Sequence, residues 1–66
     1  MPPNPLYIGD RVYIATYRKR FVVIDEDTND MWAKEYFKDE PEARGFITAN
    51  EFVLTTEEIK PWKPIN

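Results

Sequence analysis

The chain has 66 residues, of which 42% are hydrophobic and 15% aromatic, and it carries a formal net charge of −3. This length allows one small domain, and this composition is typical of a folded chain rather than a disordered one. The absence of cysteine and histidine excludes disulfide bonds and the usual zinc sites, and the negative charge argues against a general nucleic-acid binder.

Catalysis and membrane insertion also lack support in the sequence. The chain contains no Ser, Cys or His and no glycine-rich phosphate loop, so the usual pairs of nucleophile and base cannot be assembled. We therefore expect a protein that is not an enzyme and uses no metal or other cofactor. The longest uninterrupted apolar run, residues 21–24, is far shorter than the roughly 20 residues of a membrane span. Nothing resembles a signal peptide, and we predict a cytoplasmic protein.

Both ends of the chain are rich in proline, which favours extended and solvated backbone. We expect one domain over residues 1–66, with flexible tails at residues 1–5 and 61–66. The first strand is predicted over residues 10–17, where apolar and polar positions alternate. Val12 and Ile14 should point to one side of this strand, and Tyr13 and Tyr17 to the other.

A second, more central strand is predicted in "RFVVID", residues 20–25, because this segment is apolar and β-branched. The turn-forming segment "EDTND" follows. Residues 31–37, "MWAKEYF", then fit the return strand of a hairpin. The alternative for this stretch is a helix near residues 30–38 that is capped at Asn29 or Asp30.

The remainder of the chain is interpreted as a loop and further short strands. Pro41 and Gly45 interrupt a charged stretch that we expect to be a loop. Strands are expected at residues 46–49 and 52–54, with a turn at Asn50, and residues 57–62 either end the last strand or fold back over the domain. These elements predict an all-β fold, a five-stranded antiparallel barrel. The alternative is an α+β fold, in which a small sheet packs with one helix near residues 30–38.

Three segments carry a resemblance to SH3-like small β-barrels of the bacterial SH3, KOW and Tudor types. "GDRVYI" resembles the opening strand of that family, residues 22–37 are similar to its second hairpin, and "GFITANEFVL" resembles a later segment, so that residues 9–54 are covered. The resemblance implies a small closed barrel that serves as an interaction module. The motifs that bind proline-rich peptides are missing, since Thr48 stands in place of a proline and Trp32 is single.

Exposed aromatic residues are the strongest candidates for a binding site, because Trp and Tyr dominate the energetics of protein interfaces. We predict a non-enzymatic module for protein–protein interaction, either an accessory subunit of a larger complex or a regulator, such as one encoded by a phage. The predicted partner-binding residues are Tyr13, Tyr17, Trp32, Tyr36 and Phe52. In the opposing interpretation, the proline-bearing tails, with Trp62, cover this aromatic face.

A second hypothesis is a nucleic-acid-associated barrel that uses the stretch "TYRKRF". Cations would contact phosphates while Tyr17 and Phe21 stack on bases. The residues assigned to this role are Arg11, Arg18, Lys19 and Arg20. Adjacent cations point in alternating directions on an extended backbone, so a solvated joint or a contact to an acidic protein is preferred. The acids Asp25, Glu26, Asp27 and Asp30 are interpreted as a turn, because they lack the glycine and distal glutamate of an EF-hand calcium loop.

Overall fold

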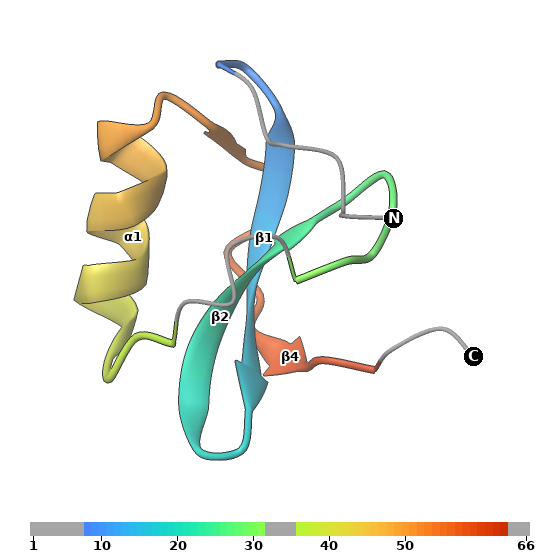
Figure 1. Cartoon of the computed structure of the whole chain (residues 1–66), viewed down its shortest axis with the longest axis vertical. Helices are drawn as coiled ribbons and strands as arrows, with labels where there is room; N and C mark the ends of the chain where they lie inside the picture. Colours follow the sequence, from blue (N-terminus) through green and yellow to red (C-terminus); the bar gives the residue numbers. More distant parts are fainter. Residues whose placement is uncertain (1–7, 32–35, 64–66) are drawn as a thin grey trace.

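The computed structural model describes residues 8–31 and 36–63. In chain order its elements are strand β1 (Arg11–Tyr17), strand β2 (Arg20–Asp25), helix α1 (Glu40–Ala49), strand β3 (Val53–Leu54) and strand β4 (Lys60–Pro61). The strands form one four-stranded sheet in which β1 is central (Figure 1), with β2 on one side and β3 and β4 on the other. The helix packs on one face of this sheet.

The long hairpin of β1 and β2 follows the alternation that the sequence predicts. The two strands are antiparallel, from the pair Val12 and Asp25 to the pair Tyr17 and Arg20. Val12 and Ile14 are buried in the cluster that includes the helix residue Ala43. A second hydrophobic cluster, formed by Ala15, Val22 and Ile24, lies on the opposite face of the sheet, and Tyr13 packs against it. The predicted orientation of residues along the first strand is therefore confirmed.

The predicted loop around Pro41 and the predicted strand at residues 46–49 are wrong, because helix α1 covers both. Asp39 caps this helix, since its side chain accepts a hydrogen bond from the backbone N–H of Glu42 at 2.9 Å. Pro41 lies in the first turn, where its missing N–H costs no helical hydrogen bond. Ala43 and Ile47, four residues apart, are buried against the sheet, and tertiary burial of this face outweighs the cost of Gly45 in the helix interior.

The predicted five-stranded antiparallel barrel is also wrong. Helix α1 carries the chain across one face of the sheet, and the chain returns on the far side of β1. There β3 pairs in parallel with Arg11 and Val12, and β4 pairs in parallel with Ala15 and Thr16. The result is an open mixed sheet with one helix, which agrees with the alternative α+β class. The helix occupies Glu40–Ala49 and not the expected region near residues 30–38.

The segment that was predicted to return beside β2 contacts that strand at both of its ends. Met31 forms an antiparallel bridge with Ile24, and Phe37 forms one with Phe21. Residues 32–35 lie outside the described residues, and with them the predicted site residue Trp32. Within the described ranges, no helix is long and apolar enough to cross a lipid bilayer.

Candidate binding surface

The turn between β1 and β2 has an unusual combination of backbone geometry and sequence. The pair Tyr17 and Arg20 closes the hairpin around a two-residue loop, in which Arg18 has φ 51° and Lys19 has φ 64°. Two successive left-handed residues correspond to a type I′ turn, for which Asn-Gly is the preferred sequence. This protein places two long cationic side chains at positions where a Cβ atom is unfavourable.

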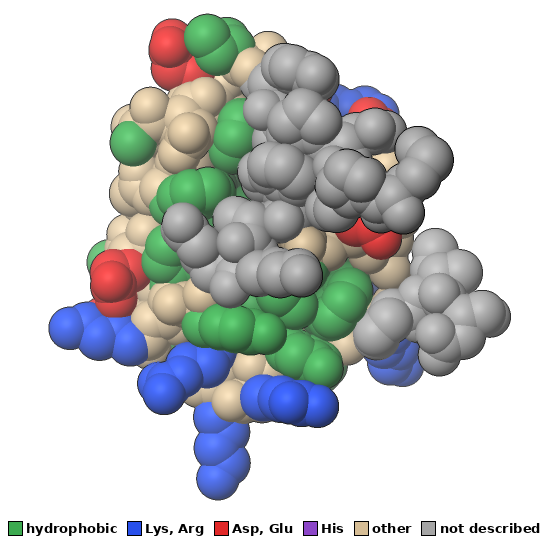
Figure 2. Space-filling model, viewed as in Figure 1, with side chains coloured by type: hydrophobic (Ala, Val, Ile, Leu, Met, Phe, Trp, Pro, Cys, Tyr) green, Lys and Arg blue, Asp and Glu red, His purple; other side chains and the backbone are tan. Residues whose placement is uncertain are grey.

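The tight turn gathers the cations at one end of the molecule. We use the name basic turn for Arg18, Lys19 and Arg20, which extended backbone would send in alternating directions. Lys38 lies at the same end, because the neighbouring Phe37 pairs with Phe21. Lys and Arg side chains line the lower edge of the face seen in Figure 2, below an area of hydrophobic side chains. This edge corresponds to the end with the β1–β2 turn in Figure 1.

No ion pair among the described residues includes a residue of the basic turn. Arg11 pairs with Glu26 and Asp27, Arg44 pairs with Glu40 and Glu57, and Lys60 pairs with Glu58. Within residues 8–31 and 36–63, no carboxylate comes within ion-pair distance of the basic turn or of Lys38. Within the described residues, these cations therefore form no ion pair with the acidic segments of the same chain.

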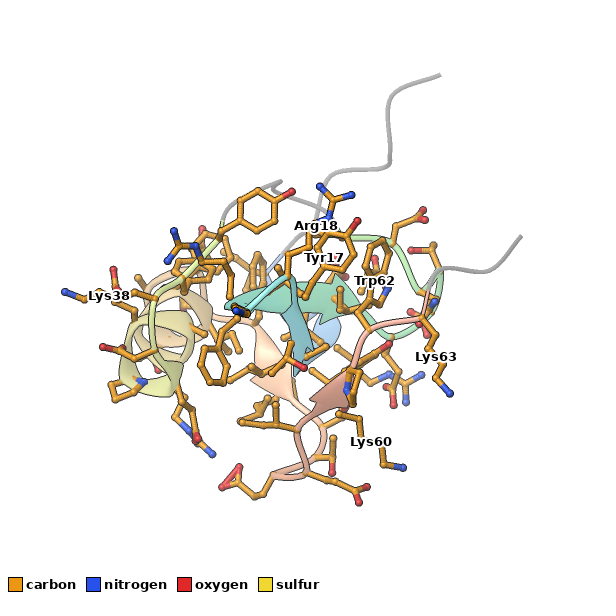
Figure 3. All side chains as sticks on the ribbon, turned by 90° about the horizontal axis from the view of Figure 1, so that it is seen from below. Tyr17, Arg18, Lys38, Lys60, Trp62 and Lys63 are labelled. Atoms are coloured by element: carbon orange, nitrogen blue, oxygen red, sulfur yellow. The ribbon has the colours of Figure 1, made fainter. Side chains whose placement is uncertain are left out.

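An aromatic group lies directly beside the basic turn. We use the name aromatic cluster for Tyr17, Tyr36 and Trp62. The rings of Tyr17 and Tyr36 stack with centroids 6.5 Å apart, and Trp62 meets Tyr17 edge-on at 5.2 Å. The Arg18 guanidinium lies 5.2 Å from the centre of the Tyr17 ring, within the range of a cation–π interaction. Figure 3 shows Tyr17, Arg18 and Trp62 together at this end.

The aromatic cluster is covered only in part. Trp62 and Tyr17 are half-buried, whereas 52% of Tyr36 is exposed to solvent. The position of Trp62 on Tyr17 agrees in part with the opposing interpretation, in which the C-terminal tail covers the aromatic face. The outer surface of Tyr36 stays accessible among the described residues, and an exposed aromatic ring next to a basic turn is a suitable contact for a partner.

Asn29 attaches the C-terminal segment to the hairpin. Its side-chain oxygen accepts a hydrogen bond from the Tyr13 hydroxyl at 2.5 Å, and its side-chain nitrogen donates to the carbonyl of Lys63 at 2.9 Å. Its backbone carbonyl accepts a hydrogen bond from the Trp62 indole N–H at 3.1 Å. Asn29 has φ 61°, a left-handed conformation that Asn adopts more readily than most residues. This residue therefore fixes the position of Trp62 in the aromatic cluster.

Tyr13 lies on the same face of the sheet but has a different role from Tyr17. Burial raises the pKa of its hydroxyl above the ordinary value of 10.0, and the negative charge of Glu26 adds to this effect. The hydroxyl remains protonated at neutral pH and donates to Asn29. Tyr13 also lines a surface cavity of about 510 Å³, beside the C-terminal segment. Within the described structure Tyr13 therefore acts mainly in holding that segment.

The remaining predicted site residues lie elsewhere. Phe52 packs against Phe46 on the helix side of the sheet, with ring centroids 5.9 Å apart. Arg11 lies at the far end of β1 from the basic turn, where its hydrogen bond to Asp27 and the charge of Glu26 raise its pKa. The structure thus brings together Tyr17, Tyr36, Arg18, Lys19 and Arg20, and it separates Arg11 and Phe52 from them.

Sequence reasoning missed Asn29 and Lys38 and gave Trp62 only a covering role. Asn in "DEDTND" does signal a left-handed turn position, but its tertiary hydrogen bonds leave no trace in the sequence. The acidic segment itself forms a turn, in which the Asp25 carboxylate accepts a hydrogen bond from the backbone of Asp27 at 2.8 Å. Within the described residues, no group of three or more acidic side chains is arranged to hold a metal ion.

The surface therefore combines a stacked aromatic pair, one ring of which is exposed, with a basic turn at one end of an acidic protein. Comparisons of the chain with protein-family models, with curated proteins and with solved structures find no match. The resemblance to SH3-like barrels is neither supported nor contradicted by these comparisons.

Proposed function

We propose that this protein is a non-catalytic module that binds a partner protein through the aromatic cluster. The observation that carries this proposal is the ring of Tyr36, which stacks on Tyr17 yet leaves 52% of the residue exposed. Tyr17 is held in turn by Trp62, by the cation of Arg18 and by the hydrophobic cluster below it. The cluster is thus largely ordered before binding, which lowers the entropy cost of association.

Affinity would come mainly from burial of the exposed part of Tyr36 and the edges of its neighbours. A buried aromatic side chain at the centre of an interface contributes about 2 kcal/mol or more when it is a hot spot. The basic turn beside the cluster would increase the association rate and select among partners by charge. The role of an accessory subunit or regulator is consistent with such a small binding surface.

The second candidate is a contact to single-stranded nucleic acid. The observation that favours it is the position of the basic turn beside the stacked tyrosines, because such proteins combine cations with aromatic side chains on which bases stack. The net charge of −3 opposes it, and Arg11 lies too far away to join the basic turn. Arg18 lies seven positions after Arg11, or about 23 Å along an extended strand that rises about 3.3 Å per residue.

The test compares capture of partners from a lysate by the wild type and by Tyr36→Ala, with nuclease and high salt as separate treatments. Val53→Ala is the matched control, since Val53 is also an exposed apolar residue, at 48%, but lies on β3. We expect the wild type to capture a partner protein whose capture persists under both treatments. This capture should be lost with Tyr36→Ala and retained with Val53→Ala. Equal capture by wild type and Tyr36→Ala would contradict the proposal, and loss with nuclease alone would favour the second candidate.

A further inference from the structure

The sequence of the basic turn is unfavourable for the backbone conformation that the turn adopts. A type I′ turn requires positive φ at both loop residues, and Asn-Gly meets this requirement with little strain. Here Arg18 and Lys19 take these conformations at φ 51° and 64°. Left-handed backbone at residues of this kind costs folding free energy, and such costs are concentrated at binding and active sites. The stability of the hairpin therefore does not explain why Arg18 and Lys19 occupy this turn.

The positive charges of the basic turn suggest an explanation. The chain has more acidic than basic residues, and Arg11, Arg44 and Lys60 all have carboxylate partners. Within the described ranges the basic turn has none, and Lys38 and Lys63, which also have none, are single cations rather than a group of three. A concentrated positive charge without an internal partner attracts an external anionic group.

Arg18 is also oriented for such a contact. Its guanidinium is held near the ring of Tyr17, and a planar guanidinium can still donate paired hydrogen bonds from its edge to a carboxylate. Tyr36 stacks on the same tyrosine. An anionic group at the basic turn and an apolar group on Tyr36 would therefore be bound next to each other.

We propose that the basic turn and Tyr36 together bind an acidic segment of a partner protein, one in which carboxylates flank an aromatic or large apolar side chain. This inference rests on the proposed function and adds the chemical class of the partner. An acidic protein segment is preferred to nucleic acid because the cations lie on a protruding turn (Figure 1), whereas single-strand binders line a groove with positive charge. The acidic remainder of the chain would also repel a long polyanion more than a short acidic segment.

The experiment measures binding of fluorescein-labelled peptides by anisotropy. The probe is an oligoglutamate that carries one phenylalanine, and the controls are the glutamine counterpart of the same length and a labelled oligothymidine. The test variant is Arg18→Asn with Lys19→Gly, which removes two charges and supplies the preferred residues of the turn. Arg11→Gln is the control for position, since it removes one cation from the other end of β1.

We expect the glutamate peptide to bind more tightly than the glutamine peptide and more tightly than oligothymidine. The double variant should weaken binding about fivefold or more, as expected for the loss of two charge contacts, and Arg11→Gln should change it less than about twofold. The double variant should also have a higher melting temperature than the wild type. Weaker binding together with greater stability cannot arise from damage to the fold.

Three results would overturn the inference. These are equal binding of the glutamate and glutamine peptides, an equal effect of Arg11→Gln and the double variant, and tighter binding of oligothymidine that depends on the basic turn. The proposed function is tested separately by Tyr36→Ala. If that variant loses the captured partner while the double variant retains it in full, the aromatic module stands and the acidic class of partner is rejected.

Discussion

Replacement of Asn29 should reveal how strongly the C-terminal segment is attached to the hairpin. Asn29→Ala removes the acceptor of the Tyr13 hydroxyl and the donor to the Lys63 carbonyl, at about 0.5–1.5 kcal/mol for each hydrogen bond. Alanine must also adopt φ 61°, which costs about 1 kcal/mol or more. The expected loss is thus about 2–4 kcal/mol, a large part of the roughly 3–10 kcal/mol expected for a domain of this size.

A glycine at the same position separates the two contributions. Asn29→Gly loses the same hydrogen bonds but adopts positive φ freely, so we expect it to cost about 1–2 kcal/mol less than Asn29→Ala. Equilibrium unfolding in urea, followed by far-ultraviolet circular dichroism, gives both free energies. Hydrogen exchange adds a local measurement at the Trp62 amide, which donates to the Thr16 carbonyl and should exchange faster in both variants.

The outcomes are distinct. If both variants unfold within about 0.5 kcal/mol of the wild type, in the range of ordinary surface substitutions, the hydrogen bonds of Asn29 do not hold the segment and the reasoning is refuted. If both lose the same free energy, the bonds contribute and the left-handed backbone does not. If stability falls while the Trp62 amide keeps its protection, the side chain of Asn29 stabilises the turn but not the C-terminal segment.

Four further predictions concern the rest of the fold. Arg18→Asn with Lys19→Gly should stabilise the protein by about 1 kcal/mol, or about 4–8 °C in Tm by calorimetry, and a lower Tm would show that the turn is not strained. The pKa of Tyr13 is raised on folding, so its protonated form is favoured in the native state and its contribution is lost as the pH rises above 10.0. Urea unfolding should therefore show stability falling more steeply in this alkaline range for the wild type than for Tyr13→Phe; parallel curves would contradict the assignment. Ile47→Ala removes a buried residue and should cost about 2–5 kcal/mol in chemical unfolding, whereas a loss below about 1 kcal/mol would mean that helix α1 packs loosely. Asp39→Ala removes the helix cap and should cost about 1 kcal/mol; a smaller effect in Asp39→Asn, which retains an acceptor, is the internal check.

The β1–β2 hairpin could be predicted because the patterns that specify it lie within a short stretch of the sequence. Alternation along β1 and the β-branched run of β2 specify the period and the buried face. Helix α1 was missed because its signals conflict with one another. Pro41 and Gly45 suggest a loop, whereas Asp39 and Glu42 form a helix start and the buried pair Ala43 and Ile47 has helical spacing. Burial against the sheet decides such a conflict, and this depends on residues far away in the chain.

Some members of the candidate site were predictable from the sequence, but their arrangement was not. Tyr17 and Tyr36 could be selected as aromatic residues, yet their stacking depends on how residues 36–37 pair beside β2. Phe52 was selected as an aromatic residue that could border the aromatic face or belong to the core, and the crossover through α1 puts it on the helix side. The parallel strands β3 and β4 arise from this same crossover, which no short pattern in the sequence encodes.

The basic turn shows how a local conflict can indicate function. Sequence reasoning treated its three cations as residues of an extended joint, in which they would not share a surface. The hairpin instead closes with a two-residue loop between Tyr17 and Arg20, which brings the three cations to one end of the molecule. Arg18 and Lys19 in this loop occupy positions where Arg and Lys are unfavourable for the backbone. Most of the chain follows the rules of local propensity and burial, and violations that the fold does not need are expected at functional sites. The violation at Arg18 and Lys19 adjoins the exposed ring of Tyr36, so the strain in the backbone and the exposure of the aromatic cluster coincide at the surface for which we propose binding.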